Sequence, residues 1–416
     1  MKTFYKSFLL LFFLLPCSSF AQGVWIQRAT FQGASRFVAV AFSIGSKGYI
    51  GTGRDSSGSG FSNDFWEWNQ ISNVWTQKAN FGGTRRMAAI GFSIGTKGYI
   101  GTGWDINLIF TQDFWEYDPS SNGWTQKANF GGAGRSRATG FSIGTKGYVG
   151  TGYNGLTYMS DFWEWNQTSN TWVQKASFPA LARLSPVSFS IGTKGYIGTG
   201  GDGNYTVNYN DFWEWNQATN IWTQKANFGG TGRTAAVGFS IGNKGYIGTG
   251  CDGINKQDFW EWDQLTNIWV QIANFGGTAR NSAAGFSIGS KGYIGMGIDG
   301  AFKQDFWEFD TTVVGVNELS NPLSIFVFPN PSCGEFQIAV NNKQSTTDNM
   351  ELEIYNVLGE KVVLSNSLSR RGRVSIPLPL GGQGYTLDIS NQPDGIYFLN
   401  IKTEKESIVQ KLIIRK

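Results

Sequence analysis

The sequence contains no histidine among its 416 residues and only three cysteines. Without imidazole it can form no Ser-His-Asp or Cys-His nucleophile arrangement, no histidine general base, and no zinc or copper site that depends on histidine. Cys17, Cys251 and Cys333 are too few for a disulfide framework. These absences exclude several large classes of enzyme and the small disulfide-rich secreted domains.

An excess of charge of either sign is also missing. Lys and Arg number 34 and Asp and Glu 30, so the formal net charge is +4. A protein that binds phosphate backbones needs a dense basic patch, and we therefore expect no nucleic-acid partner. No hydrophobic run after the N-terminal segment approaches the ~20 residues that cross a bilayer, so we expect no transmembrane segment.

The first 21 residues predict a secretory signal peptide. Lys2 and Lys6 form its positive start, residues 8–15 its apolar run, and Ser19-Phe20-Ala21 a cleavage site of the small-x-small type. The run is too short to span a bilayer. Cleavage after Ala21 would remove Cys17 and leave two cysteines in the mature chain.

Glycine and aromatic residues are abundant, and they recur in two motifs that each occur six times. The motif Lys-Gly-Tyr-(Ile/Val)-Gly-(Thr/Met)-Gly begins at Lys47, Lys97, Lys146, Lys194, Lys244 and Lys291. The motif Asp-Phe-Trp-Glu-aromatic begins at Asp64, Asp113, Asp161, Asp211, Asp258 and Asp305. A fixed period of 47 to 50 residues indicates a repeat architecture.

Each period divides into four strand-like runs separated by turn residues. In the first repeat these runs are Phe37–Ile44, Tyr49–Thr52, Phe65–Trp68 and Trp75–Lys78. Four strands cannot bury both faces of their sheet alone, whereas identical neighbours stacked around an axis can. The spacing therefore predicts a β-propeller with one blade for each repeat.

The two ends of the repeat array complement each other. The chain enters at Trp25 with a fourth-strand sequence and leaves at residues 306–310 with a third strand that lacks its fourth. We expect the N-terminal strand to complete the last blade and close a six-bladed ring, because closure removes free strand edges.

The repeats resemble the kelch family over residues 24–310. The residues that carry the resemblance are an arginine at the start of the first strand, a Tyr-Ile-Gly-Thr-Gly segment close to the family's Tyr-x-x-Gly-Gly, and a later tryptophan. The departure is Gly-Thr-Gly in place of the Gly-Gly doublet. The resemblance implies an all-β, six-bladed kelch-like propeller at residues 22–310, but no particular function, because propellers host enzymes, adhesins and scaffolds.

Candidate ligand-binding residues lie on the face formed by the connections between second and third strands, which differ in every repeat. An arginine stands eleven residues before each marker lysine: Arg36, Arg86, Arg135, Arg183, Arg233 and Arg280. Six guanidinium groups around one channel mouth would suit a carboxylate or sulfate. In the alternative, each arginine pairs with an Asp or Glu of a neighbouring blade, such as Glu67. Aromatic candidates for stacking on sugars or peptide side chains are Trp104, Tyr153, Tyr158, Tyr205 and Tyr209.

Catalysis and metal binding have less support in the sequence. Aspartates such as Asp105 and Asp252 follow the Gly-x-Gly turns, where calcium binding competes with ordinary Asp-Gly turn formation, and we expect no cofactor. Galactose oxidase is a kelch-type propeller, but its copper centre needs imidazole, and the repeated Ser-x-Asp-x-Gly-x-x-Trp box of sialidases is absent. We expect a non-catalytic, monomeric binding module for a glycan or protein. The alternatives are a surface hydrolase or lyase acting on acidic polysaccharide and a structural surface or adhesion component.

A second domain follows the repeats, because all 17 tryptophans lie before residue 308. Residues 311–321 predict a linker and residues 322–416 a β-sandwich of seven short strands. The expected strands are 325–328, 336–340, 352–355, 361–364, 385–389, 396–401 and 409–414.

Ordered motifs in this second domain resemble the type A C-terminal sorting domain of the type IX secretion system. The motif residues are Pro329, Asn330, Pro331, Gly334, Gly359, Gly395, Tyr397 and Lys411. The resemblance implies recognition by the type IX secretion machinery, export across the outer membrane of a Gram-negative bacterium, and a secreted or cell-surface product.

Overall fold

The computed structural model describes two compact units, residues 1–315 and 316–416. The described residues are 23–56, 60–202, 207–312, 324–328, 330, 332–341, 351–362, 383–402 and 407–416. The predicted signal peptide and its cleavage site lie outside them. All regular structure in the described ranges is β-strand. None of the residues that the structure describes forms a helix of the length and hydrophobicity that crossing a membrane requires.

The first unit contains six four-stranded antiparallel sheets, one for each sequence repeat, within the described residues. The first strands are β3 (Val40–Ile44), β9 (Ile90–Ile94), β14 (Thr139–Ile143), β18 (Val187–Ile191), β22 (Val237–Ile241) and β26 (Ala284–Ile288). The second strands are β4 (Lys47–Gly51), β10 (Lys97–Gly101), β15 (Lys146–Gly150), β19 (Lys194–Gly198), β23 (Lys244–Gly248) and β27 (Lys291–Gly295).

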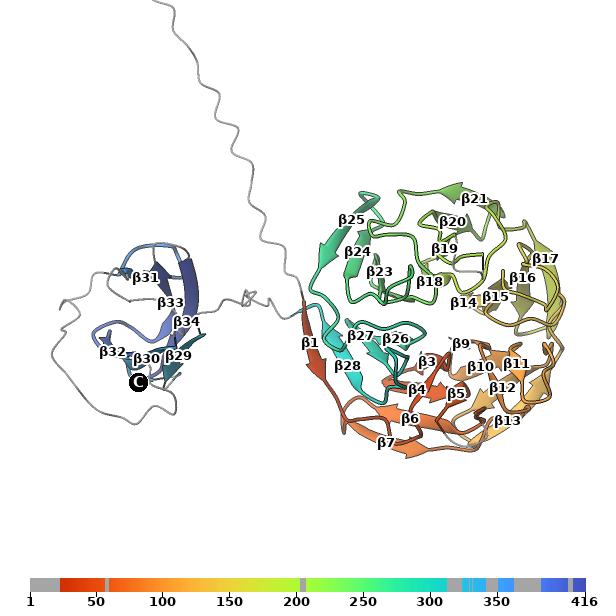
Figure 1. The fold of residues 1–416 in the computed structure, drawn as a ribbon, viewed down its shortest axis with the longest axis horizontal. Coiled ribbons are helices and arrows are strands. Elements are labelled where there is room, and N and C mark those ends of the chain that lie inside the picture. Colours follow the sequence, from red (N-terminus) through yellow and green to blue (C-terminus); the bar gives the residue numbers. More distant parts are fainter. Residues whose placement is uncertain are drawn as a thin grey trace, which may run out of the picture. The chain divides into compact units, whose positions relative to one another are not determined.

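The third and fourth strands lie farther from the centre (Figure 1). The third strands are β6 (Phe65–Asn69), β12 (Phe114–Asp118), β16 (Phe162–Asn166), β20 (Phe212–Asn216), β24 (Phe259–Asp263) and β28 (Phe306–Asp310). The fourth strands are β7 (Val74–Gln77), β13 (Gly123–Lys127), β17 (Thr171–Lys175), β21 (Ile221–Gln224), β25 (Ile268–Ile272) and β1 (Val24–Gln27). We number these repeat sheets 1 to 6 in this order.

Repeat sheet 6 joins the two ends of the repeat array. β1 pairs antiparallel with β28, with Val24 opposite Asp310 and Gln27 opposite Trp307. The first strand of each repeat sheet also contacts the first strands of two other repeat sheets, in the series β3, β9, β14, β18, β22 and β26, and β26 in turn contacts β3. The repeat sheets are arranged around a common centre in this order (Figure 1).

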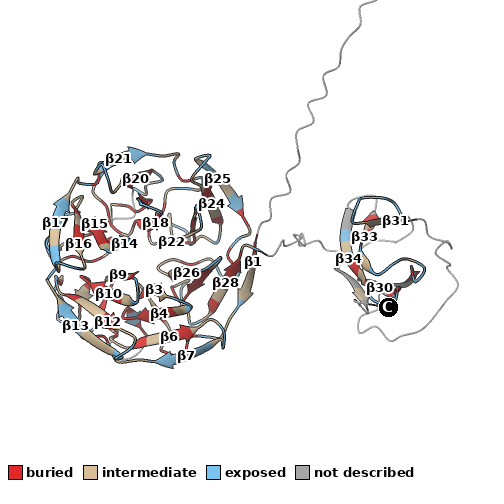
Figure 2. Ribbon diagram, turned by 180° about the vertical axis from the view of Figure 1, so that it is seen from behind, coloured by how far each residue is buried: buried red, intermediate tan, exposed pale blue. Residues whose placement is uncertain are grey.

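Neighbouring repeat sheets pack face to face through aromatic and aliphatic side chains. Phe92 and Phe114 of repeat sheet 2 share one hydrophobic cluster with Val149 and Trp165 of repeat sheet 3. The rings of Phe114 and Trp165 lie edge to face at 5.0 Å. A Cβ on Gly147 would stand 2.3 Å from the ring of Phe92, which explains why glycine follows the marker lysine. The buried residues concentrate in the first three strands of each repeat sheet, whereas the fourth strands consist mainly of exposed and intermediate residues (Figure 2).

The first strand of each repeat is shorter than the sequence predicts. We expected one strand over Phe37–Ile44, but Val38 has a φ of 46°, in the left-handed region, and β3 begins at Val40. A left-handed residue cannot continue a strand. The preceding residues instead form β2 (Arg36–Phe37), which pairs with β5 (Arg54–Asp55) in a separate two-stranded sheet. In the second repeat, β8 (Arg86–Met87) pairs with β11 (Trp104–Asp105) in the same way.

The second unit contains two three-stranded sheets, β29-β30-β32 and β31-β33-β34. Their strands are β29 (Ser324–Phe328), β30 (Glu335–Asn341), β31 (Glu351–Asn356), β32 (Gln383–Asp388), β33 (Gly395–Lys402) and β34 (Ser407–Ile414). Both sheets contribute to one core, which includes Phe336 and Leu387 from one and Ile354, Leu399 and Leu412 from the other. Two sheets that share one core form a sandwich. At the strand expected over 361–364, Lys361 forms only an isolated bridge with Tyr355, and residues 363 and 364 lie outside the described ranges.

Candidate binding face

The six marker arginines are buried, and each forms an ion pair with an aspartate. Arg36 is 0 % exposed, and its Nη1 and Nη2 atoms lie 2.5 and 2.6 Å from the two carboxylate oxygens of Asp64. Its Nε donates to the carbonyl oxygen of Ala34 at 3.0 Å, and Nη1 donates to that of Thr52 at 2.9 Å. The guanidinium carbon lies 4.9 Å from the ring centre of Phe31. The equivalent pairs are Arg86–Asp113, Arg135–Asp161, Arg183–Asp211, Arg233–Asp258 and Arg280–Asp305.

This geometry corrects our expectation of a cationic ring at a channel mouth. The guanidinium of Arg36 has five N–H groups, and the Asp64 carboxylate and two backbone carbonyls take four of them, so its charge is paired and buried instead of open to a ligand. The partner also differs from the alternative that we considered, because Arg36 pairs with Asp64 of its own repeat. Glu67 instead accepts hydrogen bonds from Lys47 and from the Tyr49 hydroxyl. The arginines therefore fix the turn between the second and third strands.

The electrostatic environment of Asp64 supports a structural role. Burial by itself would raise the pKa of Asp64, but the hydrogen bonds and charge of Arg36 outweigh burial and hold that pKa below its usual value. The Trp66 indole also donates to Asp64 at 2.8 Å. The carboxylate is thus ionised and occupied, so it cannot act as a free acid or base.

A row of five aromatic side chains spans the variable connections of repeat sheets 1, 2 and 3. Phe61 lies 5.9 Å from Trp104, which stacks on Phe110 at 6.2 Å between ring centres. Phe110 contacts Tyr153 edge to face at 5.7 Å, and Tyr153 lies 5.2 Å from Tyr158. All five are partly exposed. The structure therefore brings together three of the predicted aromatic residues and adds Phe61 and Phe110, which we call with them the aromatic row.

The other two aromatic candidates do not join the aromatic row. The ring of Tyr209 lies 4.3 Å from the guanidinium carbon of Arg183 and covers one of the buried arginines. Tyr205 lies outside the described residues. Tyr209 therefore serves the packing of repeat sheet 4 in this structure.

Exposed aliphatic side chains extend the apolar surface of the aromatic row. Leu108 is 64 % exposed, Ile109 57 %, and Leu156, in the connection of repeat sheet 3, 88 %. Leu108 has a φ of 64°. The other non-glycine residues with positive φ in the described ranges occupy positions that recur in the repeats. Leu108 is the exception, because its position has a positive φ in one repeat only. A left-handed leucine costs about 1 kcal/mol or more, and here that strain projects an apolar side chain into solvent.

Asp105 positions the connection that carries these residues. One carboxylate oxygen accepts from the backbone N–H groups of Asn107 and Ile109, and the other accepts from the Thr84 hydroxyl at 3.0 Å. Asp252 is similarly bonded to a threonine and paired with Lys256 at 2.7 Å. These contacts explain the aspartates as turn-forming residues. Within the described ranges, no group of three or more Cys, Asp or Glu side chains is arranged to hold a metal ion.

The motif residues of the second unit bind its last strand and form tight turns. Asn330 donates to the carbonyl oxygen of Lys411 at 2.7 Å and accepts from the Ile413 N–H at 2.9 Å. Gly334 has a φ of 113°, and a Cβ there would stand 2.3 Å from the backbone of Ser390. The buried Tyr397 donates to the carbonyl oxygen of a proline, Pro393.

The remaining motif residues show weaker constraints. Gly359 has a φ of 80° in the turn that follows β31. Gly395 opens β33 and has no steric need for glycine, because a Cβ there would meet only the Tyr397 ring at 3.8 Å. Pro329 and Pro331 lie outside the described residues.

The fold is propeller-like. A solved structure titled "Structure of YjhT" is similar to this chain with a TM-score of 0.56 and 14 % sequence identity, covering 67 % of this chain and 96 % of that chain. At that identity the likeness shows the fold alone. No curated protein sequence gives a significant match to this chain.

The C-terminal unit indicates the export route of the protein. Residues 326–415 match the family described as "Secretion system C-terminal sorting domain". The chain therefore carries a type IX sorting domain at its C-terminus. It is an exported protein that reaches the cell surface or is secreted.

Proposed function

We propose that this protein is an exported, non-catalytic binding protein in which a closed six-bladed kelch-like propeller presents the aromatic row and its aliphatic neighbours to a ligand. The signal peptide over residues 1–21 and the monomeric state belong to the same proposal. The ligand that the surface fits best is an apolar protein segment with acidic residues. The observation that carries the proposal is the contiguous apolar surface across three variable connections.

A closed ring is supported by contacts that recur from sheet to sheet. The Trp75 indole donates to the carbonyl oxygen of Ala29 at 2.9 Å, and Trp124 contacts Ala79 in the same way at 3.1 Å. In repeat sheet 6 the donor is Trp25, which reaches Ala273 at 3.3 Å. Gln70 donates to the hydroxyl of a tyrosine, Tyr293, 223 positions later, at 2.7 Å. A ring in which each sheet fastens the next is a rigid platform for loops.

An apolar protein ligand is favoured by the composition of the surface. The side chains of Leu108, Ile109 and Leu156 are exposed beside the aromatic rings, and an aliphatic side chain offers no hydrogen bond to the hydroxyl groups of a sugar. Exposed contiguous apolar surface is typical of protein interaction sites. Arg54 and Arg85 are exposed nearby and form no ion pair among the described residues, which favours acidic groups on the partner.

The absence of catalysis is supported by the engagement of the repeated charged residues. The repeated arginines, the aspartates paired with them and the glutamates exemplified by Glu67 bond to one another or to backbone and tyrosine groups. A general acid or base must reach the substrate within hydrogen-bond distance, and these side chains are already bonded to other groups of the protein.

The test is a binding screen with the mature chain, residues 22–416. We expect enrichment of peptides that combine apolar and acidic residues from a displayed peptide library. Leu156→Ser should weaken binding of an enriched peptide, because Leu156 is 88 % exposed beside the aromatic row. Leu265→Ser is the matched control, because Leu265 is 82 % exposed in the turn between third and fourth strands.

Three outcomes would contradict the proposal. If the two serine substitutions weakened peptide binding equally, the surface around the aromatic row would not be the binding site. A saturable signal on a glycan array that Leu156→Ser abolishes would identify a glycan-binding module instead. Product release from a uronate polymer would make the protein an enzyme.

A further inference from the structure

A ring of backbone hydrogen bonds lies at the centre of the repeat sheets. Its members are the six left-handed residues that precede the first strands: Val38, Ala88, Arg137, Ser185, Ala235 and Ser282. The N–H of each donates to the carbonyl oxygen of the previous member, at 2.8–3.2 Å, and the N–H of Val38 donates to Ser282. We call these six residues the axial ring. These bonds occupy the backbone N–H groups of all six members, so those groups are not available to a ligand at the centre.

The axial ring surrounds a cavity of about 130 Å³. The cavity is lined by the six members and by the residue that follows each of them. This volume is roughly ten times what one water molecule requires. It admits a compact ligand or one terminal group of a larger molecule.

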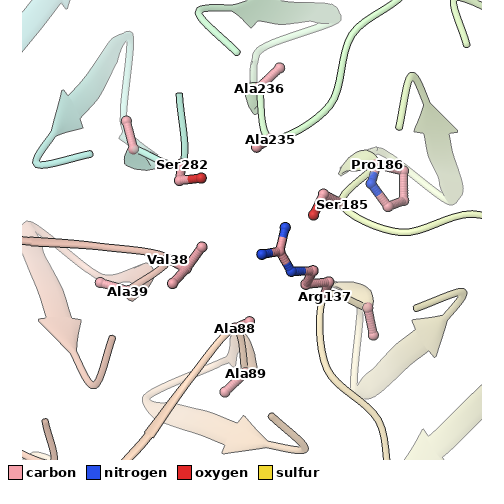
Figure 3. Close-up of a pocket in the computed structure, with 12 residues that line it drawn as sticks. Val38, Ala39, Ala88, Ala89, Arg137, Ser185, Pro186, Ala235, Ala236 and Ser282 are labelled. Atoms are coloured by element: carbon pink, nitrogen blue, oxygen red, sulfur yellow. The ribbon is translucent and has the colours of Figure 1, made fainter. Parts of the chain in front are cut away.

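Arg137 is the one charged residue among the twelve that line the cavity, and none of the others carries a carboxylate. Its side chain points into the cavity, and its guanidinium lies near the middle of the axial ring (Figure 3). Arg137 forms no ion pair among the described residues, unlike the marker arginine Arg135 two positions earlier, which pairs with Asp161. A half-buried cation without a counter-charge attracts an anion from solution.

The hydroxyl of Ser185 lies beside this guanidinium (Figure 3). Ser185 has no side-chain hydrogen bond to another described residue, so its hydroxyl is available as a donor. On the other side of the cavity, the Ser282 hydroxyl donates to Asn281 at 2.8 Å. The cavity thus offers a planar guanidinium fork and one hydroxyl donor in an otherwise alanine-rich wall.

We propose that the axial cavity binds one small oxyanion, held by the Arg137 guanidinium and the Ser185 hydroxyl. A guanidinium fork matches the paired oxygens of a carboxylate, sulfate or phosphate, and the alanine wall limits the ligand to a compact group. This site shares no residue with the aromatic row, and its existence does not depend on the proposed function.

The test is calorimetric titration of the mature chain, residues 22–416, with acetate and with sulfate, using chloride at equal ionic strength as the control. We expect saturable binding of one anion per chain. The anion with the higher affinity will show whether the site prefers a carboxylate or a tetrahedral anion. Arg137→Ala should weaken binding about tenfold or more, because hydrogen bonds from a charged group are lost. Ser185→Ala should weaken it by a smaller factor.

The repeats provide a control that distinguishes an anion bound in the axial cavity from an effect of the net charge of the protein. Ala235 occupies the same position as Arg137 in a different repeat, and the next member of the axial ring after it is also a serine, Ser282. In the double variant with Arg137→Ala and Ala235→Arg, we expect binding to return in part, because the Ser282 hydroxyl already donates to Asn281. An unchanged circular dichroism spectrum and melting temperature will show that each variant is folded.

Three results would overturn the proposal. The first two concern the unmodified chain and the single variant. One is the absence of saturable binding by either anion in the unmodified chain. The other is binding that Arg137→Ala leaves unchanged, which would place the anion elsewhere. Failure of the double variant to regain binding would also count against it, since the axial ring would then not hold the ligand at its centre.

Discussion

Arg135 and Asp161 are joined by two parallel hydrogen bonds of 2.5 and 2.8 Å at the turn between β15 and β16. Arg135 also donates to the carbonyl oxygens of Ala133 and Thr151, so one side chain fastens two chain segments that lie on either side of the second strand. The pair recurs in every repeat. Because the arginine bonds to the residues at both ends of the variable connection, it holds these ends together.

Substitution of Arg135 by alanine should destabilise the protein without removing the binding surface. It leaves Asp161 without its counter-charge, and breaking a buried pair in this way costs about 3 kcal/mol. The free energy of unfolding in urea measures this loss. A variant with unchanged stability but abolished ligand binding would restore our initial hypothesis that these arginines bind the ligand.

Stability should fall in acid because of the same carboxylates. Burial would raise the pKa of Asp161, but Arg135 outweighs burial and holds that pKa below its usual value of 3.8. A carboxyl group whose folded-state pKa is lowered contributes stability above its unfolded pKa and loses that contribution as the pH falls through the folded pKa. We therefore expect the urea midpoint to decline from about pH 5 downwards. Asp161→Asn should make the decline shallower, and an identical decline in this variant would contradict the assignment.

Replacement of Thr151 by valine should stabilise the protein. The Thr151 hydroxyl oxygen is buried and has no hydrogen-bond partner among the described residues. The equivalent position of the sixth repeat is Met296, which is fully buried in a hydrophobic cluster, so an apolar side chain is accepted there. Removing one unsatisfied hydroxyl is expected to gain about 1 kcal/mol. A melting temperature below that of the unmodified protein would show that the Thr151 hydroxyl contributes to stability and is not an unsatisfied group.

Export should depend on the second unit. Removal of residues 322–416 deletes the segment that matches the sorting family, and we expect the truncated chain to accumulate in the periplasm. Cell fractionation with an antibody against the repeat unit measures its location. Normal surface display or secretion of the truncated chain would contradict a sorting role.

The repeat pattern predicted much of the fold because its markers report local chemistry. The Lys-Gly-Tyr motif places a glycine where a neighbouring phenylalanine ring needs the space, as at Gly147 and Phe92. The pattern did not predict the left-handed backbone of Val38, because a valine gives no sequence signal for a positive φ. Its backbone is held there by the axial ring, which involves residues from distant repeats.

The site was less predictable because it depends on which side chains pair within a repeat and on which residue departs from the repeat. The marker arginines suggested a ligand site, yet each has an aspartate 25 to 28 positions later, and this equal recurrence of opposite charges was the signal of internal pairing. Arg137 was missed although it is the one charged residue at a position otherwise filled by valine, alanine or serine. The proposed oxyanion site therefore rests on a residue that departs from the repeat, and not on the repeated arginines.

The most direct test of the closed ring is deletion of residues 24–30 from the mature chain. This removes β1, leaves Glu308 without Arg28, whose Nη2 atom lies 2.6 Å away, and frees the edge of β28. We predict a fall in melting temperature of about 10 °C or more, against little change on deletion of the exposed Leu156. A melting curve that the loss of residues 24–30 leaves unchanged would contradict closure of the ring by the N-terminal strand.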